Sequence, residues 1–135
     1  MLFETNKDKG RAGMSFAIAY FGSNGYTVSV PLNDTQWYDL IIEKDGIFQT
    51  VQCKATGSQN NAISLRNCGG TKGKEYDNVL NHNLDLLFCL NSKQELFVIP
   101  IQDLKQYTPR SQITLNTNKP LNNQGFPSYK YQVQL

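Results

Sequence analysis

Two neighbouring segments in the first half of the chain, residues 38–42 and 47–55, are rich in apolar residues. Short apolar runs bounded by turn residues predict β-strands, in which successive side chains point to opposite faces. A short turn that contains Asp45-Gly46 separates the two segments. Asp-Gly between two apolar runs is a strong signal for a two-residue hairpin loop. The pattern therefore predicts a β-hairpin.

Counting residue pairs back from this turn gives the register of the hairpin. Lys44 pairs with Ile47 beside the loop, and the same register sets Asp39 opposite Gln52, with Cβ atoms roughly 5 Å apart. Lys54 lies two residues beyond Gln52 and shares its face. A carboxylate, an amide oxygen and an ammonium group are thus expected to meet at one end of the hairpin. A slip of one residue would separate them.

The opposite face of the hairpin is predicted to pack against the core. Here the register pairs Leu40 with Val51 and Tyr38 with Cys53, which gives an apolar underside. The register therefore predicts one polar and one apolar face.

The remaining segments predict an α/β fold. A helix is expected to begin at the N-cap Thr5-Asn6 and to end at Gly22 and Gly25, and its small residues Gly10, Ala12 and Gly13 suit close packing on a sheet. Further strands are expected at 26–30, 62–66, 84–90, 95–99 and 113–115, and short helices at 76–81 and 100–105, with Pro100 in the first helical position. We expect one domain, residues 1–135, with a mixed central β-sheet flanked by helices.

Composition narrows the class of protein. Hydrophobic residues make up 39% of the chain and the net charge is only +2. No apolar run approaches the roughly 18 residues that a membrane span needs. The first residues carry no export signal, and the three cysteines have no Cys-x-x-Cys spacing. A cytoplasmic protein with buried thiols is expected.

Basic residues gather in two places despite the low net charge. Such clusters are typical of contacts to a nucleic-acid backbone, and phosphate contacts need only basic side chains and free amides. The Gly-rich loop 69–73 lacks the spacing of a nucleotide-binding P-loop, so a plain flexible loop is the alternative. The candidate DNA-binding residues are Lys7, Lys9, Arg11, Arg66, Lys72 and Lys74.

Two further polar residues have weaker functional interpretations. His82 is the only histidine, which excludes metal sites built on histidine pairs, and we interpret it as a polar loop residue. Asp85 interrupts an apolar segment and needs a partner if it is buried.

The residues at the end of the hairpin suit hydrolysis of a phosphodiester by Mg²⁺. Such a site needs hard oxygen ligands, an activated water and stabilisation of the transition-state charge. Asp39 supplies a carboxylate, Gln52 a neutral side-chain oxygen, and Cys53 a backbone carbonyl. Lys54 can position or deprotonate the attacking water, or neutralise the developing charge. Taken singly, each residue is more simply read as part of a solvated strand, so the argument depends on their common register.

The chain resembles the PD-(D/E)XK nucleases. The resemblance covers roughly residues 5–105 and is closest to the small homing endonucleases of cyanobacterial introns, which also use Gln in place of Glu. It implies a restriction-endonuclease-like core of order α-β-β-β-α-β and cleavage of double-stranded DNA with Mg²⁺, for which Mn²⁺ can substitute. It also implies a homodimer or homotetramer, because cutting both strands needs two active sites. The segments that carry it are Lys9-Gly10-x-x-Gly13, Gly25-Tyr26-x-Val28, Tyr38-Asp39-Leu40-Ile41, Val51-Gln52-Cys53-Lys54 and Val98-Ile99-Pro100-Ile101.

One departure from the family pattern changes the expected chemistry. Family members commonly carry Glu directly after the glycine of the first helix, and this chain has Met14. With Gln52 also neutral, Asp39 is the only carboxylate, so metal binding is expected to depend on the DNA phosphate. Glu4 or Glu43 could substitute, although Glu43 lies about 13 Å from Asp39 along the strand.

Three functions remain open from the sequence. The first is a Mg²⁺-dependent DNA endonuclease of the homing, site-specific type. The second, which Met14 favours, is a catalytically weak or inactive DNA-binding protein on a nuclease fold. The third, which the low net charge favours, is a structural domain unrelated to nucleic acid.

Overall fold

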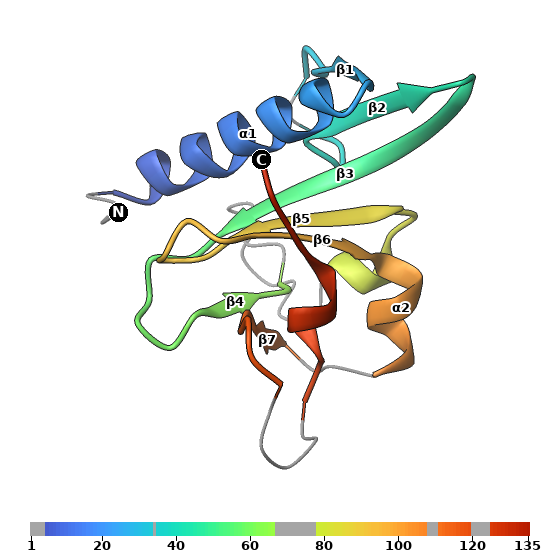
Figure 1. Cartoon of the computed structure of the whole chain (residues 1–135). Coiled ribbons are helices and arrows are strands. Elements are labelled where there is room, and N and C mark those ends of the chain that lie inside the picture. The colour runs from blue at the N-terminus through green and yellow to red at the C-terminus, as the bar shows by residue number, and fades with distance from the viewer. Residues whose placement is uncertain (1–4, 34, 67–77, 108–110, 120–124) are drawn as a thin grey trace.

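A six-stranded mixed β-sheet lies at the centre of the computed structural model. The structure describes residues 5–33, 35–66, 78–107, 111–119 and 125–135. Helix α1 lies along one face of the sheet, and the short elements of the second half of the chain lie on the other face (Figure 1). The elements are α1 (Asn6–Ser23), β1 (Thr27–Ser29), β2 (Leu40–Lys44), β3 (Ile47–Ala55), β4 (Ala62–Ser64), the 3₁₀ turn η1 (Val79–Asn81), β5 (Leu86–Leu90), β6 (Leu96–Pro100), α2 (Ile101–Gln106), β7 (Gln112–Thr114), the 3₁₀ turn η2 (Ser128–Tyr131) and β8 (Gln132–Val133).

The sheet combines antiparallel and parallel pairs. Its strand order is β1-β2-β3-β5-β6-β8, and only the β3–β5 pair is parallel. Strands β4 and β7 form a separate two-stranded sheet. The predicted mixed sheet flanked by helices is therefore confirmed.

Helix α1 begins as its sequence predicts. The side chain of Thr5 accepts a hydrogen bond from the Asp8 backbone N–H at 3.1 Å, which caps the first turn. The predicted stop at Gly22 is wrong, since Gly22 lies inside the helix and Ser23 is its last residue. Gly25 follows with φ of +85°, a conformation that suits glycine and turns the chain toward β1.

The predicted register of the β2–β3 hairpin is confirmed. Lys44 pairs with Ile47, and the ladder continues without a slip to Leu40 opposite Val51. Asp45 and Gly46 both have positive φ values, +54° and +81°, as a tight hairpin turn with the right twist requires.

Strand β3 continues beyond the hairpin and aligns β5 beside it. The Asp85 side chain accepts a hydrogen bond from the Thr50 backbone N–H at 2.8 Å, and the Asp85 N–H donates to Thr50 Oγ1 at 3.1 Å. Asp85 is exposed and precedes β5, so the predicted strand start at 84 is two residues too early. Because Asp85 is exposed, it does not require a partner, and this reciprocal contact instead joins β3 to the start of β5.

Two apolar cores lie on the two faces of the sheet. Helix α1 covers the first, which includes Leu40, Ile42 and Val51. The second includes Leu87 and is closed by the elements from β4 onward. Each sheet face is therefore covered.

The face predicted for Tyr38 is wrong. Leu40 packs on the α1 side, whereas Tyr38 packs on the second core. The ladder with β3 ends at Leu40, so alternation no longer controls the side chain of Tyr38.

The second half of the chain differs from the sequence prediction in two places. The first is Pro100, which is the last residue of β6 and the N-cap of α2 rather than the first helical residue. The weakly alternating tail forms η2 and the edge strand β8, which pairs with β6. Across the described ranges no helix is long and apolar enough to cross a membrane.

The contact of α1 with β3 gives a stability prediction. A Cβ atom at Gly13 would lie 3.4 Å from the Ala55 Cβ, whereas one at Gly10 would meet nothing within 4 Å. Gly13→Val is therefore expected to lower the free energy of unfolding by about 1–3 kcal/mol through overpacking. Gly10→Val is the matched control, and it should be neutral or slightly stabilising. Urea unfolding of both variants measures the difference, and equal effects would contradict the close approach.

Candidate active site

Asp39 lies where the hairpin ladder ends. Its backbone N–H donates to the Val51 carbonyl at 2.8 Å, and its Oδ2 atom accepts from the Cys53 N–H at 2.8 Å. The side chain thus takes the place of a strand carbonyl for β3. The predicted pairing of Asp39 with Gln52 is wrong, because the ladder ends at Leu40 opposite Val51 and the Asp39 N–H donates to the Val51 carbonyl. Asp39 is held against β3 through both its backbone and its carboxylate.

Gln52 and Lys54 share one face of β3, as predicted. Their partners on β5 are Leu87 and Cys89, which both belong to the second core, so the two polar side chains lie on the face opposite α1. The Lys54 ammonium donates to the Arg66 carbonyl oxygen at 2.9 Å. Gln52 and Lys54 are partly buried, whereas Arg66, which follows β4, is exposed.

Burial dominates the electrostatics of the site. Desolvation raises the pKa of the Asp39 carboxyl above its ordinary value of 3.8, while the Cys53 N–H and the Lys54 charge act to lower it. Burial also raises the pKa of the Cys53 thiol, to which the Asp39 charge contributes. Asp39 and Lys54 are therefore close enough to interact electrostatically.

The site has few candidate metal ligands. Across the part of the chain that the structure describes, no three His, Cys, Asp or Glu side chains are grouped so as to hold a metal ion. Glu43 lies at the far end of β2, where its carboxylate accepts from the Gly46 N–H at 2.9 Å. Glu43 therefore does not complete the site, and Glu4 lies outside the described residues. The oxygen donors at Asp39, Gln52 and the Cys53 carbonyl are chemically suited to Mg²⁺, with one carboxylate among them.

Met14 lies in the α1 segment that packs on β3. It follows Gly13 directly and is partly buried beside the core that also contacts Cys53 and Ala55. The position that carries Glu in the family pattern is thus occupied by an apolar side chain next to the hairpin.

Comparison with known proteins identifies the family. A sequence model described as PD-(D/E)XK endonuclease matches residues 4–131. The chain belongs to the PD-(D/E)XK endonuclease family. A search of curated proteins finds no match.

The fold agrees with this family assignment. The chain is similar to the bacterial homing endonuclease I-Ssp6803I, with a TM-score of 0.67 and 21% sequence identity over 95% of this chain and 87% of that chain. The PD-(D/E)XK chain therefore has the predicted restriction-endonuclease-like fold.

The predicted basic residues fall in two regions of this PD-(D/E)XK chain. Lys7, Lys9 and Arg11 lie on the first half of α1, on the face of the sheet opposite Lys54. Arg66 is exposed beside the site, with its backbone carbonyl on Lys54. Lys72, Lys74 and the Gly-rich loop 69–73 lie outside the described residues.

Two of the three cysteines lie in the described part of the chain. Cys53 and Cys89 are free, and Cys68 lies outside the described residues.

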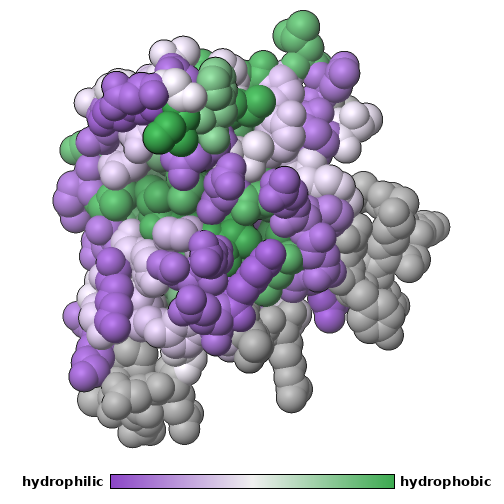
Figure 2. Space-filling model, turned by 90° about the vertical axis from the view of Figure 1, so that its right-hand side faces the viewer, coloured by the Kyte–Doolittle hydropathy of each residue, from purple (hydrophilic) through white to green (hydrophobic). Residues whose placement is uncertain are grey.

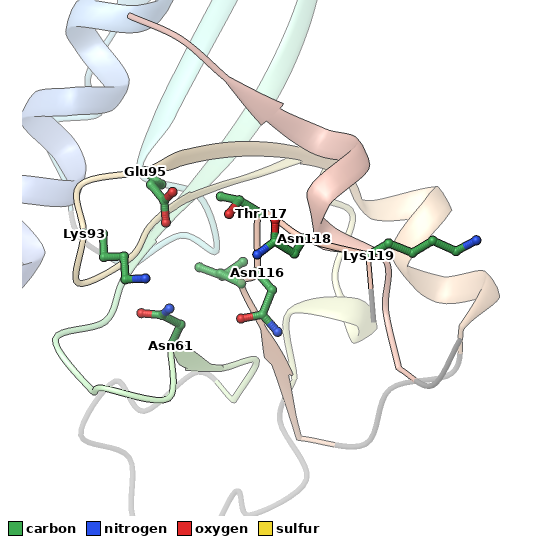
Figure 3. A pocket seen from close by; sticks show the side chains of 8 residues that line it. Asn61, Lys93, Glu95, Asn116, Thr117, Asn118 and Lys119 are labelled. Carbon is green, nitrogen blue, oxygen red and sulfur yellow. The ribbon is translucent and has the colours of Figure 1, made fainter. Parts of the chain in front are cut away.

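A polar pocket of about 260 Å³ lies near the turn between β5 and β6 (Figure 3). Its lining is rich in amide side chains and includes two lysines and one carboxylate. The spacing of these residues in the sequence did not predict a pocket. The lining residues are Asn61, Lys93, Glu95, Leu115, Asn116, Thr117, Asn118 and Lys119. None of the residues proposed for catalysis lines this pocket.

Sequence reasoning also missed an aromatic contact beside Asp39. The rings of Trp37 and His82 are stacked, with centroids 3.2 Å apart and planes inclined by 16°. The aromatic pair before Asp39 and the single histidine were both visible in the sequence. Nothing in the sequence indicated that the two would be in contact.

The surface seen from the hairpin side mixes polar and apolar groups. Figure 2 shows green apolar patches bordered by purple polar side chains on this face. Large apolar side chains exposed on the hairpin include Ile47 and Phe48, at 67% and 70% exposure beside the turn.

The raised pKa of Asp39 predicts a stability cost at neutral pH. An acid whose folded-state pKa is raised stabilises the fold fully below its ordinary pKa, and this contribution is lost as pH rises through the folded-state pKa. Asp39→Asn keeps an oxygen for the Cys53 N–H without a charge. It is therefore expected to raise the Tm at pH 7 by about 2–6 °C, with no gain below the ordinary value of 3.8.

Calorimetry at several pH values tests this expectation. Asp45→Asn in the exposed turn is the matched control, because Asn tolerates the positive φ found there. A lower Tm for Asp39→Asn at pH 7 would contradict the assigned direction.

Proposed function

We propose that the protein is a Mg²⁺-dependent, site-specific DNA endonuclease of the homing type. The observation that carries this proposal is the placement of the partly buried Asp39 carboxylate, which accepts from the Cys53 N–H, at the same end of the hairpin as Gln52 and Lys54. Family membership supports endonuclease activity, and the fold shared with a bacterial homing endonuclease supports the homing type.

Three oxygens on this chain would hold the cation. The Oδ2 atom of Asp39 is engaged by the Cys53 N–H, and no donor from the described residues reaches Oδ1. Oδ1 is therefore the carboxylate atom that we assign to the metal, together with the Gln52 side-chain oxygen and the Cys53 carbonyl. A bound Mg²⁺ would supply Lewis-acid activation of the scissile phosphate. With one carboxylate in the set, DNA phosphate oxygens would be needed as further ligands.

Lys54 is the residue we assign to charge stabilisation. Its ammonium is already oriented by the Arg66 carbonyl, which reduces the entropy lost when it acts. In the reaction it would position the attacking water or neutralise the charge that develops on the phosphate. Lys7, Lys9, Arg11, Arg66, Lys72 and Lys74 are proposed to bind the DNA backbone.

The proposed substrate is double-stranded DNA, and we propose that a homodimer or homotetramer cuts it. One chain supplies one site, and two sites are needed to cut two strands. Exposed apolar side chains at Ile47 and Phe48 are compatible with such an assembly. A supercoiled plasmid that carries the target would then give linear product early in the digest, whereas a single site would give nicked circles.

Cleavage of supercoiled DNA with Mg²⁺ or Mn²⁺ tests the proposed activity. Asp39→Ala and Lys54→Ala are each expected to lower the cleavage rate at least about 100-fold, because they remove a metal ligand and the charge-stabilising group. Lys93→Ala is the matched control, since Lys93 is an exposed lysine on the β5–β6 turn. No cleavage by the wild-type protein with either metal, or cleavage unchanged by both site variants, would refute the proposal.

A second candidate function is DNA binding without efficient cleavage. Met14 favours it, because an apolar side chain stands where the family pattern has Glu. DNA binding that persists without cleavage, and without stimulation by metal, would distinguish this function from the first.

Met14→Glu separates the two candidates. If the wild-type protein is an endonuclease with few metal ligands, the added carboxylate should lower the Mg²⁺ concentration for half-maximal cleavage by about 10-fold. Met14→Gln is the uncharged control and should not change this concentration. Activity that appears only in Met14→Glu would assign the wild-type chain to the DNA-binding function.

A further inference from the structure

The stacked rings of Trp37 and His82 join two segments that are far apart in sequence. Their centroids are 3.2 Å apart and nearly parallel, and Trp37 also packs on the second core. Trp37 lies two residues before Asp39, so their Cα atoms are at most about 7 Å apart. The stack is therefore a tertiary contact close to the carboxylate.

The segment that carries Trp37 has little other regular support. Between β1 and β2, the described residues 30–33 and 35–39 form no helix or strand. Asp39 is fixed on its C-terminal side by β3, through Val51 and Cys53. On its N-terminal side, the packing of Trp37 and Tyr38 on the second core and the His82 stack set the path of the chain.

His82 is held in place by its own backbone surroundings. The preceding turn η1 is anchored where the Val79 N–H donates to the Leu65 carbonyl at 2.9 Å. After the histidine, the Leu84 N–H donates to the His82 carbonyl at 2.9 Å. Val79 and Leu84 are both buried, so His82 lies between two core anchors. The backbone on both sides of His82 is thus held against the core, and the His82 ring stacks on Trp37 from this position.

The segment that carries His82 also pairs with Arg66, the residue whose carbonyl binds Lys54. Arg66 and Asn78 form an isolated β-bridge just before η1, and the carbonyl of Arg66 accepts from the Lys54 ammonium. One segment therefore contacts the tryptophan beside Asp39 and the residue that orients Lys54.

We propose that Trp37 and His82 form a positioning pair that sets the Asp39 carboxylate relative to Lys54 for phosphodiester cleavage. This inference rests on the proposed endonuclease function. The pair acts through the shape and packing of its rings, and the imidazole transfers no proton. It touches neither metal nor DNA in this role.

Replacement of His82 by alanine, which has no ring, and by phenylalanine, which has a ring that does not titrate, tests the pair. His82→Ala is expected to lower kcat by about 10- to 100-fold, because small displacements of catalytic groups carry costs of this size. KM for DNA should stay within about twofold, since uniform binding is retained. His82→Phe keeps a flat ring without a titrating group and should restore kcat to within about threefold of wild type with an unchanged pH profile.

Three other outcomes would each contradict the positioning role in a different way. His82→Phe as slow as His82→Ala would show that imidazole chemistry, rather than stacking, is required. A rise in KM with unchanged kcat would assign His82 to DNA binding. Wild-type kinetics in His82→Ala would show that His82 has no role in cleavage. Asn83→Ala, at the exposed neighbouring residue, is the control for local disturbance of the segment.

A measurement without cleavage separates this inference from the proposed function. Trp37 is the only tryptophan, so intrinsic fluorescence reports on the stack directly. His82→Ala should shift the emission to longer wavelength, because water reaches the indole ring once the stacked imidazole is removed. His82→Phe should leave the emission unchanged. This readout holds even if the wild-type protein cleaves nothing, and an unaltered emission in His82→Ala would refute the positioning contact.

Discussion

The candidate site depends on the register of the β2–β3 hairpin. Asp45 and Gly46 adopt the positive φ values of a two-residue turn, and that turn leaves one pairing for the strands they join. A slip by one residue would carry Gln52 and Lys54 from the second face of the sheet to the face covered by α1. It would also bury polar side chains in an apolar core, so packing of both faces selects the functional register.

The position of Asp39 illustrates a conflict between stability and chemistry. Its carboxylate is desolvated, and the Cys53 N–H and Lys54 offset only part of the effect of burial on its pKa. A carboxylate in these surroundings interacts more strongly with a cation than one in water would. The burial that makes the carboxylate unfavourable for folding would strengthen its interaction with the metal that we propose for it.

The sequence predicted the parts of the site that depend on local rules. The Asp-Gly turn, the alternation of β3 and the common face of Gln52 and Lys54 all follow from short-range patterns. The face of Tyr38 was predicted wrongly, because alternation was extended past Leu40, where the ladder ends.

Other contacts could not be predicted because they join distant residues. The Asp85 carboxylate meets the Thr50 N–H across 35 positions, and the Trp37–His82 stack also joins distant segments. Neither pattern nor composition specifies which residues meet across such intervals. The family resemblance supplied the fold, yet it said nothing of these contacts, which involve positions outside the family motif.

The segment from Asn78 to Asp85 links these contacts to one another. It meets the hairpin through Asp85 and Thr50, approaches Lys54 through the bridge to Arg66, and meets the loop before Asp39 through His82. The parallel pairing of β3 with β5 brings this segment into place, and parallel pairing requires the long crossover between the two strands to close first. The hairpin can therefore form from local contacts alone, whereas the full geometry around Asp39 and Lys54 requires β5 to join the sheet.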